Sequence, residues 1–158
     1  YGVGSRGGEI AMSILKAASY PNPESDRGEH TFGFSVYPHK NRFTESDLFA
    51  HAYAFNNPLI AKECEDNEGF LPGEYSLLGA RGAIIETVKK AEDSDDIIVR
   101  LYEPEGKRTK AKLSFGFEFK EAYFTDISEN EQKKADADSG TLETELSPFE
   151  IVTLKIKK

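Results

Sequence analysis

The sequence contains no tryptophan, one cysteine and one methionine among its 158 residues. A single cysteine, Cys64, excludes a disulfide within the chain, and no apolar run approaches the roughly 18 residues that a membrane-spanning helix needs. Basic residues are also few, with 20 lysines and arginines against 28 aspartates and glutamates. The resulting net charge of −8 repels phosphate backbones and anionic lipids, so we expect neither a nucleic-acid nor a membrane partner. Together these features favour a cytoplasmic protein.

The chain has the size and composition of a folded globular protein. Its hydrophobic share of 38% reaches the usual range for globular chains when the 13 glycines are added. It begins with Tyr1 rather than methionine and has no signal-peptide pattern, so we expect it to be part of a longer chain.

Apolar residues alternate with polar ones along most of the sequence, which is the pattern of strands rather than helices. Residues 113–119 are the clearest case, because Leu113 and three phenylalanines at positions 115, 117 and 119 alternate with polar or small residues. The same alternation predicts strands around residues 10–14, 32–36, 97–101 and 152–156. Turn-forming residues separate these runs. The sequence therefore predicts an all-β protein built as an antiparallel β-sandwich.

One short helix interrupts this pattern. Leu48, Ala52 and Phe55 have the spacing of a single helix face, and Thr44 is suited to cap the start. Because proline disfavours a helical residue before it, the helix is expected to end before Asn57-Pro58.

A polar, glycine-containing stretch from residue 63 to residue 73 indicates a boundary within the chain. We predict a first β region over residues 1–62, a linker over 63–74 and a terminal β-sandwich domain over 75–158. The first region has few strands and would expose apolar edges if it stood alone, so we interpret it as the end of a larger β domain. Residues 129–140, rich in Glu, Lys, Asp and Ser, are predicted to form a solvated loop.

Two apparent motifs have a simpler interpretation. The glycine spacing from Gly2 to Gly7 matches a dinucleotide-binding fingerprint, but that loop works only between a strand and a helix, and here an alternating strand follows. His30, His39, His51 and Cys64 lack the spacing of a metal site, so no metal is expected in this chain. Cys64 is interpreted as a partly buried apolar residue.

The densest cluster of functional side chains is Asp26, Arg27, Glu29 and His30. Paired carboxylates carry out glycoside hydrolysis, although closeness in sequence does not fix their separation in space. The alternative is an internally paired polar turn at the surface, which charged turns commonly form. Both interpretations stay open at this point.

Three groups of residues resemble, in order, the C-terminal region of family 38 glycoside hydrolases, the α-mannosidases, especially the bacterial and cytosolic type. The first contains a tyrosine-proline pair, the Asp26–His30 cluster and a proline-histidine pair, and the other two lie in the second half. They cover residues 19–39, then 90–93 with 98–103, then 125–127 with 146–151.

This resemblance implies that the chain holds the end of a mutarotase-like β supersandwich followed by a small terminal β-sandwich. It also implies a retaining, metal-dependent α-mannosidase acting through a glycosyl-aspartate, with zinc or another divalent metal, the nucleophile and the acid/base group all in a missing catalytic domain. No catalytic residue and no cofactor is carried over to this chain. Asp26, Arg27, Glu29 and His30 are the residues that the resemblance would bring close to the sugar.

Three functions follow as hypotheses. The chain is an accessory domain that supports the catalytic domain of an α-mannosidase and lines the sugar site, an independent carbohydrate-binding module, or a sandwich through which subunits form a homo-oligomer. The first has the enzyme's own catalytic domain and a mannose-containing oligosaccharide as partners. The lack of tryptophan counts against the second, because tryptophan offers the largest ring for stacking on a sugar. An exposed apolar patch would favour the third.

Overall fold

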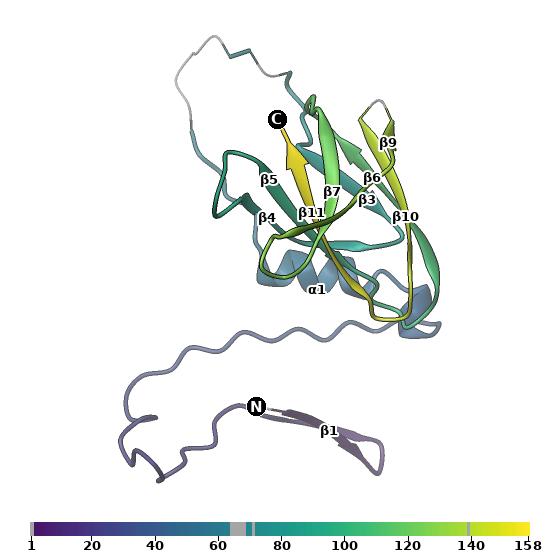
Figure 1. Cartoon of the computed structure of the whole chain (residues 1–158). Coiled ribbons are helices and arrows are strands. Elements are labelled where there is room, and N and C mark those ends of the chain that lie inside the picture. The colour runs from purple at the N-terminus through teal and green to yellow at the C-terminus, as the bar shows by residue number, and fades with distance from the viewer. Residues whose placement is uncertain (1, 64–68, 71, 139) are drawn as a thin grey trace. The chain divides into compact units, whose positions relative to one another are not determined.

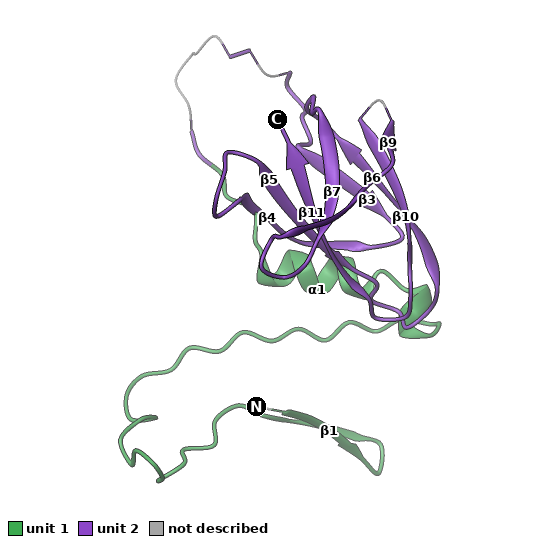
Figure 2. Cartoon of the chain, viewed as in Figure 1, with its two compact units in different colours: residues 1–61 green, residues 62–158 purple. Residues whose placement is uncertain are grey.

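The computed structural model describes residues 2–63, 69–70, 72–138 and 140–158 (Figure 1). The chain divides into two units, Tyr1–Ala61 and Lys62–Lys158 (Figure 2). Each unit is considered by itself below. The helices in the described part of the chain are too short or too polar to span a bilayer. The assignment of residues 1–62 and 75–158 to two particular β domains stays a prediction.

The first unit begins with a β-hairpin. Strands β1 (Gly2–Arg6) and β2 (Glu9–Ser13) pair antiparallel, and Gly7 and Gly8 connect them with φ angles of 61° and 84°. Two consecutive positive φ angles are the signature of a type I′ turn, which glycine forms without steric cost. The glycine motif therefore lies in a strand and a hairpin turn, a context that cannot hold a dinucleotide phosphate at a helix N-terminus.

The helix of the first unit is α1 (Leu48–Asn56), which confirms the single predicted helix. A short 3-10 helix, η1 (Phe43–Glu45), precedes it. The predicted cap was wrong, because Thr44 lies inside η1 and the N-cap position is Asp47, whose side chain makes no capping bond. Instead, the hydroxyl of Ser46 accepts the N–H of Leu48 at 3.3 Å.

The strand predicted over residues 32–36 is absent, although Phe32, Phe34 and Val36 do alternate with polar or small residues. Alternation gives a segment one apolar face, but a strand also needs a neighbour whose backbone pairs with its own N–H and C=O groups. No described strand lies beside this segment. Its three apolar side chains remain exposed.

The second unit is a β-sandwich of two antiparallel sheets. One sheet has the order β3-β6-β10-β9 and the other the order β4-β5-β11-β7-β8. The strands are β3 (Leu78–Arg81), β4 (Ile84–Lys90), β5 (Ile97–Tyr102), β6 (Thr109–Phe115), β7 (Glu121–Thr125), β8 (Glu131–Lys134), β9 (Ala137–Asp138), β10 (Thr141–Leu146) and β11 (Ile151–Lys157). These sheets confirm the predicted all-β antiparallel sandwich with one short helix.

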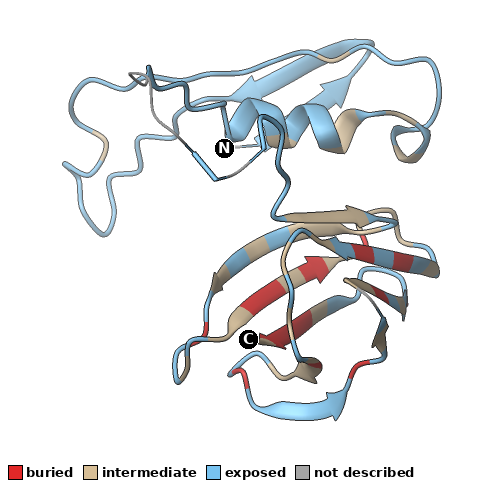
Figure 3. Ribbon diagram, turned by 90° about the horizontal axis from the view of Figure 1, so that it is seen from above, coloured by how far each residue is buried: buried red, intermediate tan, exposed pale blue. Residues whose placement is uncertain are grey.

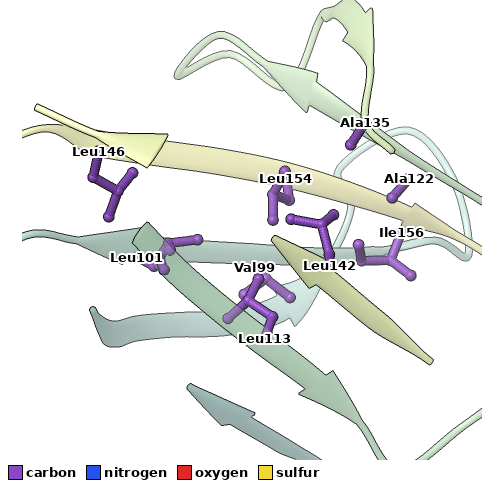
Figure 4. Close-up of a cluster of buried hydrophobic side chains, with 10 residues drawn as sticks. Val99, Leu101, Leu113, Ala122, Ala135, Leu142, Leu146, Leu154 and Ile156 are labelled. Carbon is purple, nitrogen blue, oxygen red and sulfur yellow. The ribbon is translucent and has the colours of Figure 1, made fainter. Parts of the chain in front are cut away.

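The core of the second unit lies between the two sheets. Val99, Leu101, Leu154 and Ile156 from the five-stranded sheet meet leucines at positions 113, 142 and 146 from the four-stranded sheet (Figure 4). All buried residues in the described part of the chain belong to this unit (Figure 3). Since full burial of one such side chain contributes about 1.5–3 kcal/mol, this cluster stabilises the sandwich.

Two sequence predictions fail in this unit. The strand predicted over residues 113–119 ends at Phe115, because residues 116–120 cross from the four-stranded to the five-stranded sheet. At Gly116 the chain passes so close to the Ser76 carbonyl that a Cβ would lie 2.2 Å from it. The loop predicted over residues 129–140 instead contains β8 and β9, both at sheet edges, and Ala135 is part of the core.

Candidate functional site

The Asp26–His30 cluster belongs to a turn that hydrogen bonds of the preceding residues, 22–25, stabilise. Asn22 Oδ1 accepts the N–H of Glu24 at 3.0 Å, and the Asn22 carbonyl accepts the Ser25 hydroxyl at 3.1 Å. The backbone N–H of Arg27 then donates to the Glu24 carbonyl at 3.2 Å. Gly28, with φ of 130°, takes a conformation that side-chain-bearing residues rarely adopt. Asparagine and glycine thus fix the direction in which the four candidate residues project.

The four predicted site residues do not all pair with one another. The Arg27 guanidinium donates to Glu24 Oε1 at 2.9 Å, and His30 Nε2 lies 2.9 Å from the Asp26 carbonyl oxygen. The His30 ring also stacks on Phe32, with ring centroids 6.0 Å apart. Within the described residues the carboxylates of Asp26 and Glu29 have neither an ion pair nor a hydrogen bond. The turn therefore presents two anionic groups whose hydrogen-bonding capacity is unused.

The other two histidines of the first unit, His39 and His51, both lie beside the ring of Tyr37. The Tyr37 ring lies 4.5 Å from the His51 ring and 6.0 Å from the His39 ring, measured between centroids. His39 Nδ1 is 2.7 Å from the Asn41 carbonyl oxygen. Across residues 2–63, 69–70, 72–138 and 140–158, no group of three or more His, Cys, Asp and Glu side chains is placed to hold a metal ion. Cys64 lies outside the described residues.

In the second unit, a buried carboxylate joins two turns. Glu103 is 1% exposed, and its oxygens accept the backbone N–H groups of Glu105, Gly106, Lys107 and Phe149 at 2.7–3.2 Å. Burial alone would raise the pKa of the Glu103 carboxyl, but these four donors hold that pKa below its ordinary value. Sequence reasoning missed this residue, since charged side chains are seldom buried. The available signal was a carboxylate directly before the Pro-Glu-Gly turn.

Charged pairs also cross the outer side of the five-stranded sheet. Lys155, 5% exposed, donates to Asp93 Oδ1 at 2.7 Å, and Lys89 donates to the buried Glu129 at 2.7 Å. Glu129 Oε2 also accepts the N–H of Glu92 at 2.9 Å. The hydrogen bond from Lys89 holds the pKa of Glu129 below its ordinary value. These groups satisfy one another, so we assign them to the stability of the domain.

A pocket of about 900 Å³ opens beside the segment that connects the two sheets. Three half-buried phenylalanines at positions 115, 117 and 119 form part of its lining, with ring centroids 4.8–6.4 Å apart. Ala122, Ala135 and Ala137 line it as well, and the charged residues Glu118, Lys120, Glu121 and Lys134 complete the polar part of its lining. The sequence predicted Phe117 and Phe119 as strand residues and gave no sign of a pocket.

Part of this sandwich matches a known family. Residues 82–154 match the family described as "Glycosyl hydrolases family 38 C-terminal beta sandwich domain". This segment is therefore similar to the C-terminal β-sandwich domain of family 38 glycosyl hydrolases. The match covers the strands from β4 to most of β11, and so includes the Glu103 carboxylate and all of the buried core cluster except Ile156.

Similarity to α-mannosidases extends over nearly the whole chain. Alpha-mannosidase 2C1 of Homo sapiens is 28% identical over 98% of this chain, and Alpha-mannosidase G of Dictyostelium discoideum is 27% identical over 98%. An Alpha-mannosidase of Saccharomyces cerevisiae is 25% identical over 99%. The chain spans only about 15–16% of the length of these relatives. This distant homology confirms the predicted resemblance to the C-terminal region of the cytosolic type of α-mannosidase.

Proposed function

We propose that this chain is the C-terminal accessory region of an α-mannosidase that hydrolyses α-mannosides in oligosaccharides or glycans. The observation that carries the proposal is the similarity of nearly the entire chain, both units together, to α-mannosidases. In this proposal the bond-breaking groups, and the zinc or other divalent ion of a retaining, metal-dependent mechanism, belong to a catalytic domain outside this chain. The enzyme acts in the cytoplasm.

The first unit supports a role that depends on another body of protein. Val3 pairs with Met12 and Ser5 pairs with Ile10 in the hairpin, so Val3, Ile10 and Met12 share one face. These side chains are 71%, 78% and 43% exposed. No described residue of this unit is buried. An apolar hairpin face of this kind is stable when another surface covers it, and we assign that surface to the enzyme's own catalytic domain.

The Asp26–His30 turn is the part of the chain that we place next to the sugar. Asp26 and Glu29 offer carboxylate oxygens that no described group occupies, and such oxygens are good acceptors for sugar hydroxyls. Arg27 is held by Glu24, and His30 by a backbone carbonyl, so both are oriented. These residues would position the substrate, whereas the catalytic domain would carry the nucleophile.

The experiment compares rate and stability in the full-length protein for Glu29→Gln and Asp26→Asn. Loss of an exposed charge in a turn changes the free energy of unfolding by at most about 1 kcal/mol. Loss of a contact to the transition state costs about tenfold in kcat/KM for each 1.36 kcal/mol. We therefore expect at least a tenfold fall in kcat/KM for an α-mannoside, with a nearly unchanged melting temperature.

Glu45→Gln is the matched control, because Glu45 is an exposed carboxylate of the same unit that lies outside the turn and does not orient any of the four candidate residues. We expect its kcat/KM to stay within about threefold of the unmodified enzyme. If Glu29→Gln and Asp26→Asn also stay within that range, the turn is a surface connection and its placement at the sugar site is wrong.

A further inference from the structure

We propose that the pocket beside Phe115, Phe117 and Phe119 binds a neutral oligosaccharide, so that the sandwich domain carries a sugar-binding site of its own. This inference rests on the proposed function for the identity of the sugar, a mannose-containing chain. Its physical argument comes from the pocket, which lies entirely within the second unit.

The size and lining of the pocket suit a small ligand. Its volume of about 900 Å³ falls within the range of about 300–1,000 Å³ typical of small-molecule sites. The three phenylalanines contact one another and pack against the core on their inner side. Rings held in this way lose little conformational freedom on binding, which favours their use as contact surfaces.

The charges that line the pocket decide which chemistry fits. Glu118 and Glu121 contribute two negative charges and Lys120 and Lys134 two positive charges, so the four sum to zero. A ligand with net charge of either sign therefore gains no overall attraction. A purely apolar ligand would cover charged groups without replacing their hydrogen bonds to water. A neutral ligand with many hydroxyl groups avoids both costs.

Two of these groups are already fixed in place. Lys134 donates to Glu121 Oε1 at 2.5 Å, and the Tyr123 hydroxyl donates to Glu121 Oε2 at 2.8 Å. The hydrogen bond from Lys134 holds the pKa of Glu121 below its ordinary value, which keeps this acceptor ionised. The backbone N–H of Lys120 donates to the Lys157 carbonyl at 2.8 Å. The ammonium group of Lys120 has no ion-pair partner in the described part of the chain and is free to donate.

Sugars present both features that this lining requires. A pyranose has an apolar C–H face that packs on an aromatic ring and an edge of hydroxyls that donate and accept hydrogen bonds. Phenylalanine gives a smaller contact area than tryptophan, so we expect millimolar rather than micromolar affinity. The site would hold one part of a branched or extended substrate while another part is hydrolysed elsewhere on the enzyme.

The test is an NMR titration of the ¹⁵N-labelled 158-residue chain with an α-linked mannotriose, and with trigalacturonate as an acidic comparator. We expect saturable shifts in the amides of residues 115–122, 134–138 and 140, with the neutral sugar binding at least threefold tighter. Phe117→Ala should weaken binding at least tenfold, whereas Phe70→Ala, which removes a 96% exposed ring outside the pocket, should leave it unchanged.

Phe117 packs against the core, so its replacement could also weaken the fold. Lys120→Ala is therefore measured beside it and should weaken binding about threefold. Lys110→Ala is its control, because Lys110 lies on β6 outside the pocket lining. The inference is overturned if no saturable shift occurs up to about 50 mM sugar, equivalent to binding weaker than about −2 kcal/mol. It is also overturned if the shifts lie elsewhere or the acidic sugar binds as tightly. Hydrolysis by the full-length protein without binding at this pocket would overturn this inference alone. Binding without hydrolysis would instead overturn the proposed function and leave the sugar-binding site in place.

Discussion

Replacing Glu103 with alanine should destabilise the sandwich more than any exposed charge substitution. The carboxylate is buried and accepts four backbone N–H groups, three from the turn between β5 and β6 and one from Phe149 in the turn between β10 and β11. The N–H of Glu103 also donates to the Glu150 carbonyl at 3.0 Å. One side chain thus holds two turns together at one end of the domain.

The size of the effect follows from these bonds. A hydrogen bond to a charged group contributes about 1.5–3 kcal/mol net, and a buried donor left without a partner costs about 1–3 kcal/mol. Lys107 is exposed, and Glu105 and Gly106 are partly so, which lets water replace some of the lost acceptors. We therefore expect a loss of about 2–4 kcal/mol rather than the sum of four bonds. For a domain of this size, 1 kcal/mol shifts the melting temperature by about 4–8 °C.

The assay is urea unfolding of the 158-residue chain, followed by the circular dichroism of its strands. Glu145→Ala is the control, because Glu145 is exposed and its pairing with Arg108 at 3.9 Å is of the kind that contributes at most about 1 kcal/mol. A loss below about 1 kcal/mol in Glu103→Ala, or an equal loss in both variants, would refute the role given to the buried carboxylate.

Two further predictions concern pH and proteolysis. The pKa of Glu103 is lower in the folded state than its ordinary 4.5, so its ionised form stabilises the fold above that value, and this contribution is lost as pH falls through the lowered folded pKa. The free energy of urea unfolding between pH 6 and 3 should therefore depend less on pH in Glu103→Gln than in the unmodified chain. An equal dependence on pH in the two proteins would contradict this. Limited trypsin digestion should cut the first unit, for example after Arg27 and Lys40, well before the second unit, because no described residue of the first unit is buried. Mass spectrometry should find a resistant fragment close to residues 62–158. Equally rapid cleavage after Arg100 within β5 would contradict the assignment of the core.

The strands around Ile97 and Leu154 were predictable because each combines alternating apolar residues with flanking turns, and each lies in the middle of its sheet with one face in the core. Strand β8 was not predictable in this way. All its side chains are exposed, so an edge strand with a polar sequence looks the same as a loop. Residues 32–36 show the opposite failure, since alternation without a neighbouring strand is not sufficient for a strand.

The candidate site was predictable in its residues but not in its pairing. Closeness in sequence brought Asp26, Arg27, Glu29 and His30 into one turn, yet Arg27 pairs with Glu24 rather than with either neighbouring carboxylate. The path of the turn decides this, and it depends on Asn22 and Gly28 rather than on the charges themselves. The buried hydrogen bonds of Glu103 could not be predicted, because they depend on which backbone N–H groups the fold leaves without strand partners, and no local sequence pattern shows this.

The most direct test of the central claim is the hydrolysis of an aryl α-mannoside by three purified proteins: the full-length protein, the same protein ending before Tyr1, and the 158-residue chain alone. We expect the full-length protein to hydrolyse the α-mannoside and not the β-mannoside. Removing the chain should abolish activity or lower the melting temperature by several degrees, since in our proposal it uncovers the surface of the catalytic domain that the hairpin face covers. The chain alone should show no turnover. Activity that follows the 158-residue chain by itself, or a full-length protein without α-mannosidase activity, would contradict the proposal.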